Sequence, residues 1–529
     1  LTAYITADNR SDVRIGKYFT VPYPDHEKLF VRVAELSYVQ QFATDDANEI
    51  HAQRALRTSG VDETDYKFLA RLDPIAVIAG GKRRMPDRIP KPNASVERAK
   101  DKNEIKTGLN IPGDGVFIGH LSVGGDKVRT NSSPPTIDYC LRNEYGDADP
   151  LIFRHLLIAG GTGSGKSHTA KNILRQFSTG VRYEMDDGRS ARPSIVVFDP
   201  QNEYAQMHDD NSEVEDEDTK AWDAEGIEYG GHDDTIAFVP KVDGYSYDAE
   251  NHRASQVEFS IPFEMVEDNK WLLAGADLSE NQQIGLNLLL RDYFGEADDP
   301  SYAGFTDFVL DVTREDYYVE QTGRIHEATY NALKRKVADN PVFDRVFDCS
   351  ADPITDDSML KKFVRSGGVS VVPTYHITNS RAEEVVVLAL ASLVVDNKLS
   401  TGGKEVIKET PLVLAMDEAH NFLAETDTAQ GRRIKGKFSE AAKQGRKERL
   451  GLFLITQDPG DIADPVFKQI NTKVVLNLGD EQAIQSVNIP KELEDKVPYM
   501  EKGQMVVYSP DNSEPVEVIG LPKCVTKHS

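Results

Sequence analysis

The amino-acid sequence predicts an α/β fold, in which a mostly parallel sheet carries an inserted helical bundle and follows an N-terminal β-barrel. Three observations predict it. Apolar, strand-like segments alternate with helical patterns after residue 153, a long helical stretch interrupts this alternation, and short apolar segments fill the first ~150 positions. Buried parallel strands separated by helices are typical of α/β domains. A chain of 529 residues exceeds one typical core, so several domains are expected.

The N-terminal region, residues 1–145, is predicted to form the barrel. Apolar segments at 29–33, 76–79 and 115–119 each lie near Gly, Pro, Asp or Asn. Short strands with frequent turns are typical of a small β-rich module. The stretch 83–102 contains prolines and mixed charges, and we expect a loop or irregular connection there.

The central core is expected to come from two parts of the chain, residues 146–220 and 368–500. Helical patterns fall between its apolar segments, which favours parallel strands joined by helices. The predicted strands are 155–159, 195–199, 369–374, 412–417, 451–456 and 473–478, and the predicted helices include 167–177, 382–397 and 438–449.

A long insertion, residues 221–367, separates the second and third predicted strands and is expected to be a compact helical bundle. Ser279 and Gln282 make a capping-box pattern ahead of apolar residues at helical spacing. The last region, residues 501–529, is predicted to be a C-terminal β segment with two short strands around a polar turn.

Composition excludes several classes. The formal net charge of −26 excludes a general attraction to nucleic acid, so any DNA contact requires a local basic surface. The acidic run 209–234 is expected to be a solvated loop without chemistry. Three scattered cysteines argue against a disulfide framework or a metal site. The longest strongly apolar run, 385–395, is too short to span a bilayer, and no secretion signal is evident, so we expect a cytoplasmic protein with no membrane partner.

A phosphate-binding loop is the strongest motif. Residues 160–167 match G-x-x-x-x-G-K-[ST] after an apolar strand and at the start of a helix. Glycines let backbone N–H groups curl around a phosphate, and the helix N-terminus adds partial positive charge. Lys166 is expected to span the β- and γ-phosphates, and Ser167 to ligate Mg²⁺. The predicted ATP-binding residues are Gly161, Thr162, Gly163, Ser164, Gly165, Lys166, Ser167 and His168.

Hydrolysis also requires carboxylates at the end of a neighbouring strand. The apolar segment 412–416 is followed directly by Asp417 and Glu418. Asp417 is expected to hold the Mg²⁺ shell, and Glu418 to orient and deprotonate the attacking water. Together with Lys166, these residues predict an ATPase that uses ATP and Mg²⁺.

Other polar residues end predicted strands at the same edge. Gln457 follows the strand 451–456, where its amide could sense the γ-phosphate or water. Asp199 ends the strand 195–199, and Glu203 lies one turn later. Because strand C-termini line the ligand crevice of a parallel sheet, these are predicted further site members. Ordinary strand-ending polar residues remain the alternative interpretation.

The densest positive stretch, residues 432–449, lies between Glu418 and Gln457 in sequence, so we predict it near the nucleotide edge. Part of it could contact a phosphate backbone, and one arginine could reach a neighbouring subunit's γ-phosphate. A solvated helix face is the third interpretation, and the residues alone leave the three open. Arg154, just before the first strand of the core, is a second arginine candidate.

The ordered set of motifs resembles the HerA family of hexameric DNA-translocating ATPases, which are related to the FtsK translocases. The set comprises Arg154-His155, the loop 160–167, Asp-Pro-Gln-Asn-Glu-Tyr at 199–204, Asp-Glu-Ala-His at 417–420, Gly-Arg-Lys at 445–447 and Thr-Gln-Asp-Pro at 456–459. The order is specific, although no single motif is. The resemblance covers nearly the whole chain and implies a RecA-like core, with Arg446 as a trans-acting or sensor arginine and Gln457 as a sensor. Asn202 replaces the glycine usual in the family, which leaves the role of Glu203 open.

The resemblance further implies a homo-hexamer that threads double-stranded DNA through its pore and hydrolyses ATP between subunits. Archaeal members pair with the NurA nuclease in DNA-end processing, and bacterial relatives pair with other effectors, some in phage (antiviral) defence. We therefore expect a translocase or helicase that works with a NurA-like nuclease or another effector subunit. An ATP-dependent hexameric scaffold, with motor activity secondary, is the alternative.

Other ATPase classes fit less well. A superfamily 2 helicase would place Asp-Glu-Ala-His about a hundred residues after the P-loop and add a second RecA-like domain. Here the gap is about 250 residues and only about 110 follow, too few for such a domain. No Leu-Ser-Gly-Gly signature of an ABC-type ATPase is present. Conjugation and secretion ATPases share the core but usually carry membrane helices or docking partners, so soluble members stay open.

Overall fold

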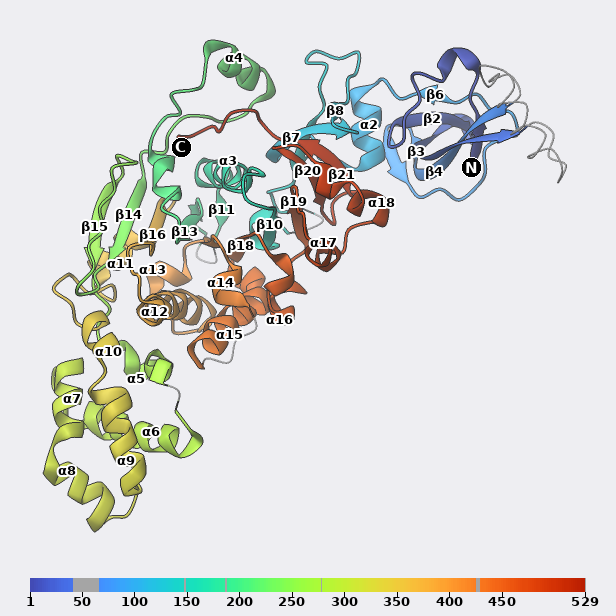
Figure 1. The fold of residues 1–529 in the computed structure, drawn as a ribbon. Helices are drawn as coiled ribbons and strands as arrows, with labels where there is room; N and C mark the ends of the chain where they lie inside the picture. Colours follow the sequence, from blue (N-terminus) through green and yellow to red (C-terminus); the bar gives the residue numbers. More distant parts are fainter. Residues whose placement is uncertain (41–65, 147–148, 186–187, 277, 425–428, 529) are drawn as a thin grey trace, which may run out of the picture. The chain divides into compact units, whose positions relative to one another are not determined.

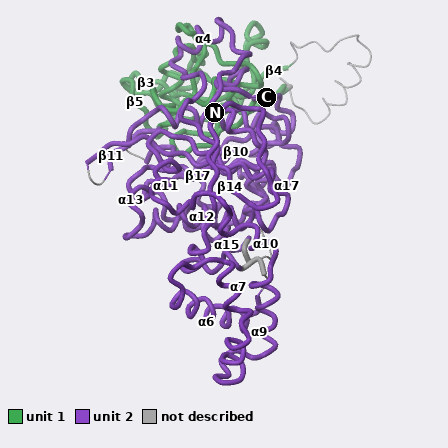
Figure 2. Tube along the Cα trace, turned by 90° about the vertical axis from the view of Figure 1, so that its left-hand side faces the viewer, with its two compact units in different colours: residues 1–142, 504–520 green, residues 143–503, 521–529 purple. Residues whose placement is uncertain are grey.

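The structure is a computed structural model that describes residues 1–40, 66–146, 149–185, 188–276, 278–424 and 429–528 (Figure 1). The chain divides into two compact units (Figure 2). Unit 1 comprises residues 1–142 and 504–520, and unit 2 comprises residues 143–503 and 521–529.

The first sheet of unit 1 is antiparallel, and among the described residues it does not close into the predicted barrel. Its strands run in the order β1 (Thr2–Tyr4), β4 (Tyr66–Ala79), β3 (Glu27–Gln40), β2 (Tyr18–Tyr23) and β6 (Glu97–Arg98), and β5 (Lys82–Arg84) pairs with β4. The path ends on edge strands of three and two residues. Neither edge offers a ladder long enough to close the sheet on itself. One face buries apolar residues that include Val21, Leu29, Val31 and Leu72.

Unit 1 also contains strands from both ends of the chain. They are β7 (Val116–Val123), β8 (Asp126–Lys127), β9 (Asp138–Leu141), β20 (Gln504–Tyr508) and β21 (Val516–Ile519), and helix α2 (Lys102–Leu109) lies in the same unit. Strand β21 pairs with both β20 and β7, so the two short C-terminal strands complete a sheet begun by N-terminal residues.

Unit 2 is built on a large parallel sheet, as predicted. Its strands run in the order β15 (Ser255–Phe259), β14 (Thr235–Pro240), β16 (Val369–Pro373), β13 (Ser194–Asp199), β17 (Leu412–Met416), β18 (Leu450–Thr456), β10 (Leu156–Ala159) and β19 (Thr472–Val475). All six predicted strands are present. Strands β14 and β15 correct the prediction, because they lie in the stretch 221–367 that was expected to be helical. Both pair in parallel at the edge beyond β16, which a sequence pattern alone does not reveal.

Helices cover both faces of this sheet (Figure 1). Helix α3 (Lys166–Thr179) follows β10 on one side, and α12 (Ser380–Leu399) and α15 (Ala429–Gln444) pack together on the other. Residues 385–395 of α12 are buried, so this apolar run is a core helix. Shorter helices are α13 (Glu405–Lys408), α14 (His420–Leu423), α16 (Asp464–Phe467), α17 (Glu481–Val487) and α18 (Lys491–Glu494), and a small hairpin pairs β11 (Tyr183–Glu184) with β12 (Ser190–Ala191).

Most of the inserted helices form a bundle that begins near residue 263. They are α5 (Met265–Asp268), α6 (Glu280–Glu296), α7 (Tyr302–Leu310), α8 (Val312–Asp316), α9 (Glu327–Leu333) and α10 (Pro341–Val346). Helix α11 (Asp357–Phe363) lies beside the sheet and contacts α13. The predicted capping box of Ser279 and Gln282 starts α6. At the root of the bundle, the ring of Phe263 stacks on Phe305 at 5.3 Å and meets Phe347 edge-on at 5.5 Å.

The acidic run is not the loop that was expected. Residues Asp216–Glu225 form helix α4, which starts with a capping box between Glu215 and Asp218. Trp222 anchors the helix, because only 3% of this residue is exposed. The acidic residues in its first turn interact favourably with the positive end of the helix dipole, and this interaction stabilises the helix. Across the described part of the chain, no helix combines the length and apolar sequence needed to cross a membrane.

Candidate functional site

The phosphate-binding loop, residues 160–165, joins β10 to α3 and is tied to the neighbouring strands. The N–H of Gly160 donates to the carbonyl of Thr456 at 3.1 Å, and the N–H of Gly161 donates to the carbonyl of Asn477 at 2.6 Å. These bonds hold the start of the loop between the ends of β18 and β19. The loop therefore leaves the sheet at its carboxyl edge, where parallel strands place ligands.

Glycines give the loop its curl. Gly163 and Gly165 have φ values of 77° and 103°, in the left-handed region that favours glycine. Gly165 is the N-cap of α3, so the first N–H groups of a 14-residue helix open onto the loop. An anion placed there meets backbone donors and the positive end of the helix dipole.

The three residues that begin α3 lie in different surroundings. Lys166 is 7% exposed and donates from Nζ to the carbonyl of Gly161 at 3.1 Å. Burial lowers the pKa of this amine, while the acids Glu418, Asp417 and Glu203 act in the opposite direction. Ser167 is half-buried. The ring of His168 lies 5.7 Å from that of His528, and burial lowers its pKa to about 4, so this side chain faces the C-terminal residues of unit 2.

A hydrogen-bonded chain links the loop to the catalytic candidates. The hydroxyl of Thr162 donates to Oε1 of Gln457 at 2.8 Å, and Nε2 of Gln457 donates to Oε1 of Glu418 at 2.5 Å. Gln457 follows β18 and Glu418 follows β17, which are neighbours in the sheet. The fold thus brings together three side chains from widely separated segments.

Glu418 is held in an unusual conformation. Its φ of 45° lies in the left-handed region, which a residue other than glycine seldom adopts. It is 7% exposed, and its Oε2 has no hydrogen-bond partner among the residues described; Nδ1 of His420 lies 3.4 Å away. Strained and buried polar groups of this kind cluster at functional sites.

Four carboxylates gather at this edge. Asp199 is fully buried, which raises its pKa to about 6, although its oxygens accept the N–H groups of Tyr204 at 2.8 Å and Glu203 at 3.1 Å. Burial raises the pKa of Asp417 well above its usual range, and the nearby charges of Asp199, Glu418 and Glu203 raise it further. Oε2 of Glu203 is buried without a hydrogen-bond partner among the described residues.

This donor set fits a magnesium–nucleotide complex. Mg²⁺ takes oxygen ligands, usually one or two carboxylates together with substrate phosphates and water. Because the charges of the neighbouring carboxylates raise the pKa of Asp417, a cation bound beside it would relieve their repulsion. Asp417 and the hydroxyl of Ser167 are the residues that would hold the ion, and the loop and Lys166 would hold the phosphates.

The C-terminal half of the basic segment lies at the other end of the strands, contrary to the prediction. Helix α15 starts after Glu418, at the carboxyl edge, and returns to the amino edge, where a 3-10 turn (Gly445–Glu448) precedes β18. Consecutive parallel strands require this return, which the order of motifs did not take into account. Arg446 lies in the turn and pairs with Asp149 at 3.3 Å. Arg154 is 3% exposed at the amino end of β10.

Cations in the first half of the segment are engaged within the chain. The guanidinium of Arg433 lies 3.5 Å from the centre of the Trp271 ring. Lys437 forms an ion pair with Asp396 of α12. These contacts tie α15 to its neighbours, so this half is in part structural.

Two residues at the site were missed by sequence reasoning. Nδ1 of His420 lies 3.2 Å from the hydroxyl of Thr456, next to Glu418. Its position two residues after Glu418 was the available signal. Asn477 accepts the N–H of Gly161, and its own amide donates to the carbonyl of Met500 at 2.7 Å. No local pattern indicates this clamp, because the two segments meet only in the folded sheet.

Comparisons with known proteins find similar sequences among helicases. A family model described as "Helicase HerA, central domain" matches residues 143–392. The chain is 21% identical over 515 residues to "Probable helicase MJ1565" of Methanocaldococcus jannaschii, covering 94% of this chain and 84% of the relative. It is also 21% identical over 515 residues to "DNA double-strand break repair helicase HerA" of Sulfolobus acidocaldarius, covering 95% and 87%. Among solved structures, VirB4 of Thermoanaerobacter pseudethanolicus is 15% identical, with a TM-score of 0.49, covering 78% of this chain and 97% of that one.

Proposed function

Because this chain is a P-loop ATPase of the HerA family, we propose that it assembles as a homo-hexamer and uses ATP hydrolysis to move double-stranded DNA through the ring pore. The observation that carries the proposal is the hydrogen-bonded chain from Thr162 through Gln457 to Glu418. It joins the phosphate loop to a buried carboxylate, as a hydrolytic motor requires. Relatives named as DNA double-strand break repair helicases support DNA as the substrate. The parallel sheet of unit 2 then serves as a RecA-like core.

Glu418 is proposed as the general base. Gln457 fixes one carboxylate oxygen, and the second is buried without a hydrogen bond among the described residues. That second oxygen is the one available to accept a proton from the attacking water. A positioned general base contributes about 10²–10⁴-fold to a rate, so loss of this carboxylate removes most hydrolysis. Gln457 senses the nucleotide through its bond to Thr162.

The remaining residues bind rather than react. Lys166 and the loop N–H groups hold the phosphates, and Asp417 with Ser167 holds the metal. Mg²⁺ neutralises charge on the β- and γ-phosphates when it is bound with ATP. Asp199 and Glu203 lie beside Asp417 and tune the charge at this edge.

Arg446 is proposed to act on a neighbouring subunit. It lies at the amino end of β18, which has seven residues, so a strand length of about 23 Å separates it from its own nucleotide edge. Its side chain is 46% exposed, and its ion pair with Asp149, whose side chain is 38% exposed, is a surface contact. An exposed arginine at the edge opposite its own site is suited to complete a site across an interface.

We propose that the ring works with a nuclease or another effector subunit. DNA-end repair with a NurA-like nuclease is the favoured role, and phage defence with another effector is the second. The scaffold alternative predicts that an inactive ring still assembles with its effector and supports the effector's activity. The motor proposal predicts that effector activity on long DNA requires hydrolysis.

The decisive experiment measures ATPase activity of the purified chain with and without duplex DNA. The expected result is stimulation by duplex DNA, with loss of at least about 100-fold in Glu418→Gln. Glu320→Gln in the exposed part of the helical bundle is a matched control that removes the same charge far from the site, and it should retain wild-type activity. Native mass spectrometry with Mg-ATP should give six copies. A monomer that is indifferent to DNA contradicts the proposal.

A further inference from the structure

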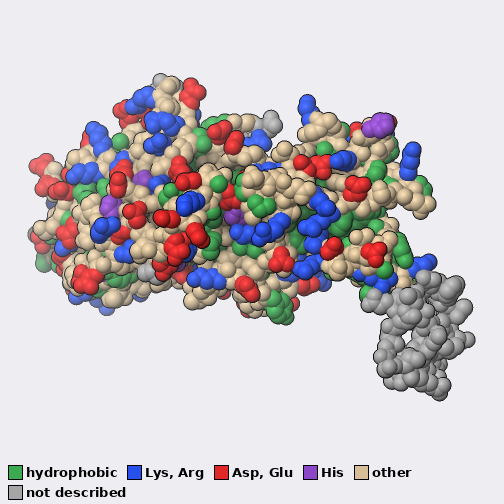
Figure 3. Space-filling view, turned by 90° about the horizontal axis from the view of Figure 1, so that it is seen from above, with side chains coloured by type: hydrophobic (Ala, Val, Ile, Leu, Met, Phe, Trp, Pro, Cys, Tyr) green, Lys and Arg blue, Asp and Glu red, His purple; other side chains and the backbone are tan. Residues whose placement is uncertain are grey.

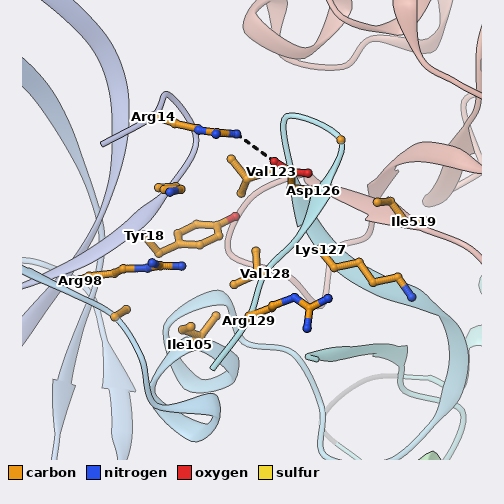
Figure 4. A pocket seen from close by; sticks show the side chains of 13 residues that line it. Arg14, Tyr18, Arg98, Ile105, Val123, Asp126, Lys127, Val128, Arg129 and Ile519 are labelled. Carbon is orange, nitrogen blue, oxygen red and sulfur yellow. Dashed lines mark hydrogen bonds and ion pairs between the residues drawn. The ribbon is translucent and has the colours of Figure 1, made fainter. Parts of the chain in front are cut away.

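Unit 1 contains a cavity of about 540 Å³ that the ATPase site does not involve (Figure 4). It lies between β2, β6, α2 and the β7–β8 hairpin, and Ile519 of β21 closes one side. A cavity of this size is within the range that holds small organic ligands. All of its walls belong to one compact unit.

The charged residues that line the cavity are mostly cations. Five line it, namely Arg14, Lys17, Arg98, Lys127 and Arg129, against a single acid, Asp126. This is unusual in a chain whose net charge is −26, in which acidic and basic side chains intermingle over the face drawn in Figure 3. Asp126 is already engaged, because it accepts from Arg14 at 2.9 Å.

Part of the positive charge at this cavity has no ion-pair partner in the described part of the chain. Arg98 and Arg129 are exposed and form no ion pair among the residues that the structure describes. The pKa of Lys17 is lowered by burial and then by repulsion from Arg98 and Arg14, which shows that these cations act on one another. When an anion enters, it lowers the repulsion among cations that are held together in this way.

The floor of the cavity is apolar with one polar group. Ile105, Val123 and Val128 contribute aliphatic surface. The ring of Tyr18 is stacked on Phe30 at 5.3 Å, and its hydroxyl points into the cavity in Figure 4. A cationic rim over an apolar floor suits a ligand with both phosphate and organic parts. Guanidinium groups also match phosphate oxygens in pairs.

We infer that this cavity binds a phosphate ester, either a phosphodiester of duplex DNA or a free nucleotide. The chemistry is shared by the two sources. The DNA source rests on the proposed function, whereas the nucleotide source does not. An acidic segment of a partner protein has the same charge but lacks the tetrahedral oxygens that several arginines can grip together.

The test uses the full chain with Lys166→Ala, which removes nucleotide binding at the P-loop. In this background, Arg98→Gln/Arg129→Gln is compared with Lys82→Gln/Arg83→Gln, a pair of exposed cations in β5 that lies outside the cavity. One arm titrates a short labelled DNA duplex at several salt concentrations. The other arm titrates a fluorescent ATP analogue.

The expected result is that the cavity variant loses about 10-fold in affinity for one of the two probes and the control pair does not. If DNA is the ligand, the slope of log affinity against log salt falls by about 2, because two phosphate contacts are removed. Arg98→Lys/Arg129→Lys should lose less affinity than the glutamine pair, because it keeps the charge but not the paired guanidinium contacts. Asp126→Asn should strengthen binding by releasing Arg14. Thermal melting of each variant establishes that it is folded.

Unchanged binding of both probes in a folded variant overturns the inference. The inference is also overturned if the cavity variant binds both phosphate probes as before but no longer binds an acidic protein partner. Failure of the proposed function has a different signature. ATPase activity that is never stimulated by DNA in the otherwise wild-type chain removes the motor, but it leaves the nucleotide arm of this test intact.

Discussion

The side-chain amide of Gln457 donates a 2.5 Å hydrogen bond to Glu418, and this contact connects the ends of two neighbouring strands, β18 and β17. Gln457 also accepts from Thr162 in the phosphate loop at 2.8 Å. A change at the phosphates can therefore pass to the carboxylate through a single amide group. This relationship joins a binding loop and an acid into one site.

Replacement of Gln457 by alanine should lower kcat by about 10- to 100-fold while ATP affinity changes little. The carboxylate of Glu418 remains but loses the group that orients it, and general-base catalysis depends on geometry first. Thr162→Val, which removes only the donor to Gln457, should give a smaller loss in the same direction. Steady-state ATPase assays and equilibrium nucleotide binding measure the two quantities. Equal losses in binding and turnover would contradict this role.

Asp199 should make the free energy of unfolding fall as pH rises from 5.5 to 7.5. Its folded pKa is raised to about 6, above the unfolded value, so the folded chain binds the proton more tightly and loses that advantage as pH passes 6. The change attributable to this group is about 1 kcal/mol over that interval, since the unfolded carboxyl is already ionised. Urea titrations without Mg²⁺ should show a shallower pH dependence in Asp199→Asn.

Asp307→Asn is the control for that measurement, because Asp307 is exposed on the helical bundle. It should keep the pH dependence of the wild type. If Asp199→Asn keeps it as well, the slope arises elsewhere and burial of Asp199 is not its cause.

Gly160→Ala should disrupt the phosphate loop more than Gly161→Ala in the nucleotide-free protein. A Cβ at position 160 would lie 2.6 Å from Oγ of Ser164 and 2.9 Å from Cβ of Leu476, whereas at position 161 the nearest atom is 3.4 Å away. Overpacking of this kind costs about 1–3 kcal/mol. Thermal melting ranks the two variants, and nucleotide titration of Gly160→Ala should show at least about 10-fold weaker binding. Equal melting temperatures for both would refute the steric account.

Arg446 and Glu418 should complement each other in mixed rings. Arg446→Ala and Glu418→Gln are each expected to be inactive alone. When the two proteins are mixed and reassembled, some sites combine an intact Glu418 with an intact Arg446 from the next subunit, and activity should partly return. ATPase rates across mixing ratios provide the measurement. If the mixture has no more ATPase activity than the two variants measured separately, then Arg446 acts in the same subunit's site as Glu418 or does not act at the site.

The contact between Arg433 and Trp271 should stabilise the junction between α15 and the inserted region by about 1 kcal/mol, as a partly exposed cation–π pair does. Arg433→Met should alter the tryptophan emission spectrum and lower the free energy of unfolding by about that amount. Lys443→Met, an exposed change on the same helix, should do neither. An unchanged spectrum in Arg433→Met would show that the ring is not covered by this side chain in solution.

Sequence reasoning worked where chemistry and order along the chain are local. The loop 160–167 is contiguous, and its glycines and lysine stand at fixed spacings, so its strand–loop–helix form followed directly. Strands of the parallel sheet were likewise indicated by continuous apolar runs, each bounded by helices. Sequence reasoning failed where the structure of a segment depends on a neighbouring strand that is distant in the sequence. Strands β14 and β15 form because an edge of the sheet is available to them, and the short edges β1 and β6 end the N-terminal sheet before it closes.

By itself, the sequence determined that this chain binds and hydrolyses nucleotide, because those groups are specified by residue type and spacing over a few positions. Only the tertiary structure decided which side chains share the site. The parallel order β17-β18-β10 places Glu418, Gln457 and Thr162 within hydrogen-bonding reach of one another. Thr162 and Gln457 are 295 positions apart in the sequence. The connection from β17 to β18, through α15, places Arg446 at the opposite edge of the sheet. The physical reason is that a parallel sheet gathers every strand's carboxyl end on one side and must return each connection to the other.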